Sequence, residues 1–113
     1  MLATRLRIAL CAAGLALIAA PAFAQQPAAG NADAARAKIS MCAGCHGVAG
    51  YKMAYPEVYH VPKIGGQQQA YLLNALKAYK SGERNHPTMR SIAASLSEQD
   101  MADLAAYYSG GAK

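Results

Sequence analysis

The sequence predicts an all-α domain of about four helices, and three observations support this class. Apolar residues recur at helical spacing from Gln67 to Ser81, where Gly82 ends the pattern. Ser97 and Asp100 are spaced as in a capping box, and a second apolar stripe follows them to about Ser109. No segment alternates convincingly in the way a half-buried strand does. With 113 residues, the chain holds one domain at most.

Two shorter helices complete the expected set. Asn31 is a candidate N-cap for a helix from Ala32 to about Met41, which Gly44, Gly47 and Gly50 break. A second short piece is expected from Met89 to Ala94. Between these helical segments, prolines and glycines predict a long loop over residues 47–66 with no regular structure.

The N-terminal segment is typical of a cleaved export signal. Arg5 and Arg7 precede an apolar run, residues 8–20, that is shorter than the about 20 residues a membrane span needs. The small residues Ala22 and Ala24 predict cleavage directly after Ala24. An uncleaved membrane anchor is the alternative, and the length of the apolar run argues against it.

We therefore divide the chain into a signal peptide (1–24), a flexible leader (25–30) and one domain (31–113). The domain is expected in the periplasm, with no transmembrane segment. Without the two signal arginines, nine basic and six acidic residues give a net charge of +3. Because the lysines are scattered and form no basic cluster, we expect no nucleic-acid partner.

The cysteines of this domain cannot link distant parts of the fold by disulfides. Cys42 and Cys45 are the two that remain after cleavage, and they are too close in sequence for a disulfide framework. A core this small supplies only about 3–5 kcal/mol, so small exported domains usually need another stabiliser. A large, flat, apolar cofactor in the core would serve that purpose.

The segment Cys42-Ala43-Gly44-Cys45-His46 indicates which cofactor this is. Two thiols about one helical turn apart match the two vinyl groups of haem, and the next histidine can reach the iron. This pattern is a c-type haem attachment signal. A thioredoxin-like dithiol would need a preceding strand, and a zinc site would need more ligands. A plain disulfide across so short a loop would stabilise little.

His46 supplies one axial ligand to the iron, and the second must come from elsewhere in the chain. The candidates are Met41, Met53, Met89, Met101, His60 and His86. Met41 adjoins Cys42, Met53 follows His46 too closely, and Met101 belongs to an apolar stripe. Met89 is the best candidate because it lies far along the chain, in a loop fixed by Pro87, with His86 as a less favoured alternative.

Several stretches of the chain match one known family. They are residues 42–47 (CAGCHG), 62–67 (PKIGGQ), 71–72 (YL), 82–84 (GER), 89 (M), 96–100 (LSEQD) and 105–108 (AAYY). Together they make the chain, from about residue 33 to 109, resemble the small bacterial class I cytochromes c, particularly the cytochrome c4, c5 and c553 group. One departure is the tyrosine-rich stretch 51–61, which is longer than the minimal family pattern.

The resemblance implies the class I cytochrome c fold, in which about four helices surround one covalently bound haem c. It implies His46 and Met89 as axial ligands and a Pro62 carbonyl that accepts a hydrogen bond from the His46 ring, which orients the imidazole. It also implies that Ile64 packs on the haem. Arg84 is a candidate partner for a haem propionate, since arginine pairs well with carboxylates, and a solvated turn residue is the alternative.

These features predict a one-electron carrier of a respiratory or other redox chain, and not an enzyme. Its redox protein partners would dock transiently at the haem edge, where lysines could steer an acidic partner. The lysines in question are Lys52, Lys63, Lys77 and Lys80. Tyr71 and Tyr79 are expected in the core and not as redox relays. Two alternatives stay open: the haem subunit of a larger periplasmic dehydrogenase, and a haem enzyme or sensor with an open sixth site.

Overall fold

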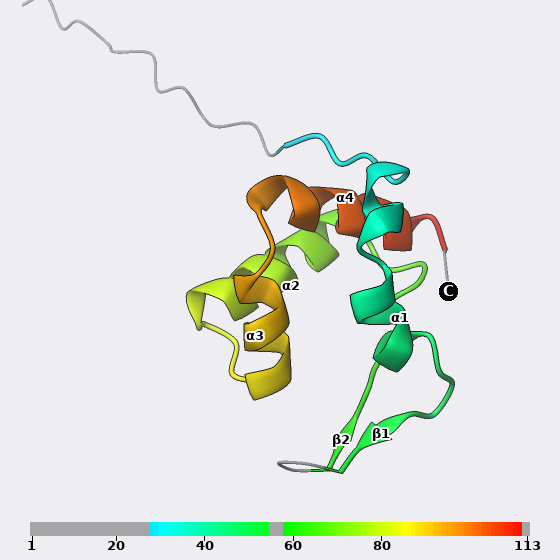
Figure 1. Cartoon of the computed structure of the whole chain (residues 1–113), viewed down its shortest axis with the longest axis vertical. Helices are drawn as coiled ribbons and strands as arrows, with labels where there is room; N and C mark the ends of the chain where they lie inside the picture. The colour runs from blue at the N-terminus through cyan, green and yellow to red at the C-terminus, as the bar shows by residue number, and fades with distance from the viewer. Residues whose placement is uncertain (1–27, 55–57, 112–113) are drawn as a thin grey trace, which may run out of the picture.

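A computed structural model describes residues 28–54 and 58–111, so the predicted signal peptide lies outside the described residues. The elements are the 3₁₀ helix η1 (Ala34–Ala37), α1 (Ser40–His46), β1 (Lys52–Met53), β2 (Tyr59–His60), α2 (Gln69–Ser81), α3 (Pro87–Ala94) and α4 (Glu98–Ser109). The four α-helices in this part of the chain confirm the predicted fold class (Figure 1). Within the same ranges, no helix combines the length and apolarity that a membrane crossing requires.

The core lies between α4, α2 and η1. Met101, Leu104 and Ala105 of α4 are buried against Leu72 and Leu73 of α2. The three residues from α4 recur at the spacing of one helical face, which is what the sequence pattern predicts. Met101 has no exposed surface, so its prediction as a core residue is confirmed.

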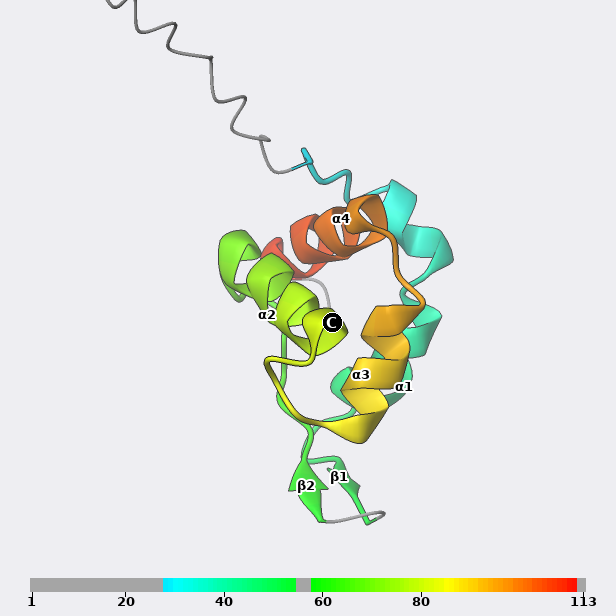
Figure 2. The same ribbon diagram turned by 90° about the vertical axis from the view of Figure 1, so that its left-hand side faces the viewer.

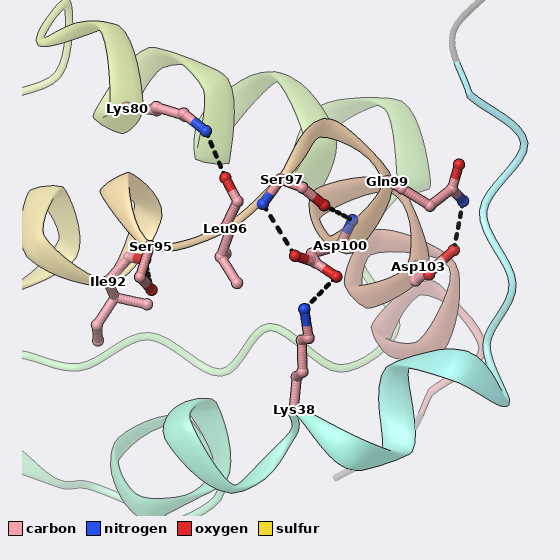
Figure 3. Close-up of polar contacts among 9 residues, drawn as sticks. All are labelled: Lys38, Lys80, Ile92, Ser95, Leu96, Ser97, Gln99, Asp100 and Asp103. Atoms are coloured by element: carbon pink, nitrogen blue, oxygen red, sulfur yellow. Dashed lines mark hydrogen bonds and ion pairs between the residues drawn. The ribbon is translucent and has the colours of Figure 1, made fainter.

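The start of α4 is held by the predicted capping box. The Ser97 hydroxyl accepts the backbone N–H of Asp100 at 3.1 Å, and the Asp100 carboxylate accepts the N–H of Ser97 at 2.9 Å. Figure 3 shows the ammonium group of Lys38, which lies between η1 and α1, paired with the same carboxylate. The hydrogen bond from Lys38, followed by those from the backbone N–H and the hydroxyl of Ser97, lowers the pKa of Asp100 to about 2.

Helix α2 is close to its prediction, except for one tyrosine. It ends at Gly82, whose φ of 89° lies in the left-handed region that favours glycine. Tyr71 was predicted in the core; it does not pack with Leu72 and Leu73 but is 52% exposed and lines the cavity described below. The reason is that Leu72 and Leu73 occupy the face toward α4, which turns Tyr71 away from the core. Tyr79 is half-buried.

The first predicted helix is two helices. The 3₁₀ helix η1 places Ala35 in the core and ends at Ala37. The N–H of the next residue, Lys38, donates to the Ala35 carbonyl at 2.8 Å. The chain then starts α1, which runs through Gly44 instead of stopping there. A single glycine costs a helix only about 1 kcal/mol, so α1 continues past Gly44 and ends at His46, with Gly47 as its C-cap. The N-cap of η1 is Asp33 and not Asn31 as predicted, although the Asn31 side chain accepts the N–H of Asp33 at 2.9 Å.

The predicted loop over residues 47–66 contains a short antiparallel hairpin. Lys52 pairs with His60 and Met53 pairs with Tyr59, and the Val61 N–H donates to the Tyr51 carbonyl at 3.0 Å. The expectation of no strands is therefore wrong, because strands of two residues are too short to show an alternating pattern. The hairpin lies at the end of the molecule away from α4 in both views (Figures 1 and 2).

The N-terminal segment is fastened to α4. The backbone N–H of Asn31 donates to the buried carboxylate of Asp103 at 2.7 Å, and Gln99 donates to both Asp103 and the Ala29 carbonyl. Gly30 lies so close to this helix that a β-carbon there would stand 2.2 Å from the Ala102 oxygen. Two residues of the expected leader therefore contact the domain.

Candidate functional site

The Cys42 and Cys45 thiols lie on α1, at the spacing of one helical turn. Both are unpaired and half-buried. Burial raises the pKa of the Cys42 thiol, the nearby Tyr108 hydroxyl opposes this shift, and Cys45 adds to it. The Cys42 side chain packs against the edge of the core.

The His46 ring at the end of α1 is held in one orientation. Its Nδ1 lies 2.6 Å from the Pro62 carbonyl oxygen, to which it donates a hydrogen bond. This is the contact that the resemblance implies. With the proton on Nδ1, the lone pair of the neutral imidazole is on Nε2, which is the form that binds a metal.

One cavity of about 560 Å³ collects all of the candidate site residues. Its size is within the range of about 300–1,000 Å³ that small-molecule and cofactor sites occupy. Every main element contributes to its walls, and most of the lining side chains are apolar. The sequence-predicted residues on these walls are Cys42, Cys45, His46, Pro62, Ile64, Arg84 and Met89.

Met89 lies in the first turn of α3, and not in a loop. Helix α3 begins at Pro87, a residue preorganised for the first helical position. The residue before it, His86, is the N-cap, and its Nδ1 accepts the Met89 N–H at 3.3 Å. Histidine is absent from the usual capping residues, so sequence reasoning missed this role of His86.

Two other methionines share the cavity wall. Met41 of α1 and Met53 of β1 line it together with Met89, whereas Met101 is not part of it. Met41 is on the same helix as His46, and Met53 is on the hairpin. Met89 belongs to α3, which stands across the molecule from α1 in Figure 1.

Two tyrosines of the cavity lining have polar neighbours. The Arg84 guanidinium lies over the Tyr79 ring, 4.7 Å from its centroid, and both side chains line the cavity. The Tyr108 hydroxyl is buried on this wall, and the Cys42 thiol is its polar neighbour. Burial, followed by the Cys42 thiol, raises the pKa of Tyr108 to about 12, so this hydroxyl is neutral.

The cavity brings together two thiols, an oriented imidazole and a methionine thioether in a mostly apolar lining. This combination is typical of a protein that holds a planar metal cofactor covalently. The chain matches the cytochrome c family over residues 34–109. It belongs to this family, as a small class I c-type cytochrome that carries covalently bound haem c.

Individual relatives agree with this assignment. Cytochrome c-554(548) of Halomonas halodenitrificans is 43% identical over 84 residues, which cover 72% of this chain and 96% of that protein. Cytochrome c4 of Pseudomonas aeruginosa is 41% identical over 81 residues, covering 72% of this chain but 38% of the relative. A thiosulfate dehydrogenase electron acceptor of Thiomonas intermedia is 34% identical over 76 residues, covering 67% and 34%. The chain thus spans about a third of the last two proteins.

The cavity fits this cofactor. Haem is large, flat and mostly apolar, and the walls offer apolar side chains over most of their surface. The two thiols and the His46 ring, whose Nε2 carries the lone pair, lie in the same lining and are groups that can hold such a cofactor. Electron transfer is the activity of the cytochrome c family, and this protein is an electron carrier in that general sense.

Proposed function

We propose that this protein is a periplasmic one-electron carrier with a six-coordinate haem c, ligated by His46 and Met89, that serves a respiratory or other redox chain. The observation that carries the proposal is the cavity that brings the two thiols, His46 and Met89 together. When bound, the haem supplies an iron that changes by one electron between its ferric and ferrous states.

The role of the chain's own residues is to keep this site rigid and dry. Cys42 and Cys45 would form the two thioethers, and Pro62 keeps the imidazole of His46 in place through the bond at 2.6 Å. Histidine–methionine ligation raises the reduction potential, and an apolar pocket also disfavours the additional charge of ferric haem. Ile64 on the cavity wall contributes to that apolar environment. Arg84 is placed to pair with a propionate.

Substitution of Met89 tests the ligand assignment. Methionine bound to ferric haem gives a weak absorption band at the red end of the visible spectrum, as the family resemblance implies. Met89→Ala should abolish this band, whereas Met53→Ala, on the same cavity wall, should retain it. A band that survives in Met89→Ala would contradict the assignment, and His86 would be the next ligand to test.

An open sixth site would indicate a haem enzyme or sensor instead. Such a protein would have a high-spin ferric spectrum and would bind cyanide or carbon monoxide at once. We expect a low-spin spectrum and slow binding, because Met89 must first leave the iron. Optical spectra recorded after mixing with each ligand decide between the two.

Docking is proposed to occur at the haem edge, through an interface under about 1,200 Å². Of the four lysines named above, Lys77 is paired with Glu98 at 2.7 Å, and Lys80 donates to the Leu96 carbonyl (Figure 3). Lys52 and Lys63 are both exposed, and Lys63 also lines the cavity, so these two are the better candidates to steer an acidic partner. Electron-transfer rates should then fall with rising salt.

A second candidate is a haem protein that works with one dedicated dehydrogenase. It is favoured by the similarity to proteins named thiosulfate dehydrogenase electron acceptors, at 34% and 37% identity. Co-purification from periplasmic extract separates the two candidates. A stoichiometric dehydrogenase partner supports the second, and isolation as a free monohaem protein supports the first.

Export rests on residues 1–24, outside the described residues. Cleavage after Ala24 predicts a mature chain that starts at Gln25. Mass spectrometry of the haem protein from the periplasmic fraction measures this directly. A chain that retains residues 1–24 in the membrane fraction would contradict the proposal.

A further inference from the structure

The tyrosine-rich hairpin contacts the beginning of α3. The ring of Tyr59, in β2, packs on the imidazole of His86, with centroids 4.5 Å apart and ring planes inclined by 57°. Tyr59 is paired with Met53 in the hairpin, which fixes its place in the register. Tyr59, His86 and Met53 all line the cavity, so this contact belongs to its wall.

His86 in turn holds the first turn of α3 at two points. Its Nδ1 accepts the N–H of Met89 at 3.3 Å, and its carbonyl accepts the N–H of Arg90 at 2.9 Å. Pro87 has no N–H, so it leaves no donor unsatisfied at its position. Because Nδ1 accepts, the neutral ring carries its proton on Nε2. One residue therefore satisfies the donors of both Met89 and the residue after it.

We propose that His86 and Tyr59 are positioning residues for Met89: the Tyr59 ring fixes the His86 imidazole, and the imidazole fixes the Met89 backbone. The hairpin, which departs from the minimal family pattern, thereby controls how often the Met89 thioether leaves the iron. This inference rests on the proposed function, because it requires Met89 to be the axial ligand.

The chemistry of the thioether makes such support effective. Methionine has three rotatable side-chain bonds and a neutral, weakly binding sulfur, so its backbone must be fixed for the sulfur to remain in place. If the first turn of α3 frayed, Met89 would no longer be held in place, and a bound haem would be open to an added ligand. An added ligand binds only this open form, so its apparent affinity measures the open fraction.

Cyanide binding to the ferric holoprotein measures that fraction. His86→Ala should raise the apparent cyanide affinity about fivefold, the equilibrium equivalent of one typical helix cap. His86→Asn keeps a side-chain oxygen that can accept the Met89 N–H, and it should return the affinity to within about threefold of native. If His86→Asn binds cyanide as tightly as His86→Ala, a wider cavity is the cause and the proposal fails.

The tyrosine is tested in the same titration. Tyr59→Ala removes the ring that supports the imidazole and should raise the cyanide affinity about threefold, less than loss of the cap itself. Tyr59→Phe retains the ring and should behave as native. An unchanged affinity in Tyr59→Ala would remove Tyr59 from the proposal.

Two further measurements separate this proposal from general destabilisation. Ser97→Ala removes the N-cap of α4, away from the cavity, and should lower thermal stability without changing cyanide affinity. Amide hydrogen exchange at Met89 should accelerate about fivefold in His86→Ala but not in Ser97→Ala. Equal cyanide affinities in native, His86→Ala and Tyr59→Ala proteins would overturn the proposal.

Failure of the ligand assignment would give a different result. If Met89→Ala keeps the red absorption band, Met89 is not the ligand and the proposed function must change. If that band is lost but His86→Ala leaves cyanide affinity and Met89 exchange as in the native protein, the ligand is correct and the positioning role is wrong.

Discussion

Helices α4 and α1 represent two regions with different sources of stability. Helix α4 buries six of its residues and starts with a complete capping box. Helix α1, which carries the two thiols and His46, buries none and has no side-chain cap. Helix α4 thus packs against other parts of the polypeptide, whereas α1 faces the cavity. This difference indicates that α1 depends on the haem for its packing.

Loss of haem attachment should have the largest effect. A Cys42→Ser, Cys45→Ser double variant removes both thioethers and leaves α1 with no buried partner. A domain of this size supplies only about 3–5 kcal/mol, so we expect most of its unfolding free energy to be lost. Haem staining on a denaturing gel and thermal unfolding by circular dichroism measure this. A native-like cooperative transition without haem would contradict the comparison.

A methionine in each region gives the next test. Met101 in α4 is 0% exposed, and Met41 in α1 is 40% exposed. Met101→Ala should cost about 2–5 kcal/mol of unfolding free energy by leaving a cavity. Met41→Ala should cost less, because Met41 lies on the cavity wall and packs against less of the polypeptide than Met101 does. Denaturant unfolding compares them, and equal losses would mean that α1 is as well packed as α4.

Helix α4 was easier to predict from the sequence than the site, because the signals that start it are local. Ser97 and Asp100 act on their own neighbours, so their spacing is visible in the sequence, and the structure has that box. The hairpin pairs only two residues per strand, and its position depends on contacts with α3. His86 caps α3 through a ring nitrogen, which no local pattern announces. Tyr71 is exposed because its two neighbours in sequence take the core face.

The N-terminal contact on α4 should have a smaller effect than the core methionine. Gly30→Ala places a β-carbon 2.2 Å from the Ala102 oxygen, so the segment must move away. We expect a loss of about 1–3 kcal/mol, with the bond between Asn31 and Asp103 broken. Gly44→Ala is the matched control, since its β-carbon would meet no described atom within 4 Å. Equal thermal midpoints for both variants would show that the contact is dispensable.

The smallest expected effect concerns pH. The pKa of Asp100 is lowered to about 2, chiefly by Lys38, from an ordinary value of about 3.9. Its contribution to stability is therefore present above about pH 4 and is lost as the pH falls toward 2. Asp100→Asn should be less stable than native at pH 7, and the difference should shrink below pH 4. Thermal midpoints between pH 7 and pH 2 measure this, and a constant difference would contradict it.

The bond between Asn31 and Asp103 joins residues that are 72 positions apart. The two ends of the domain are therefore neighbours in space, and the contact between them requires almost the whole length of the domain. A chain that ends before Asp103 lacks the acceptor for its own first turn. Contacts of such long sequence separation form late and slow folding. The thiols of α1 thus stay accessible, for a time, in a chain that has not yet finished folding.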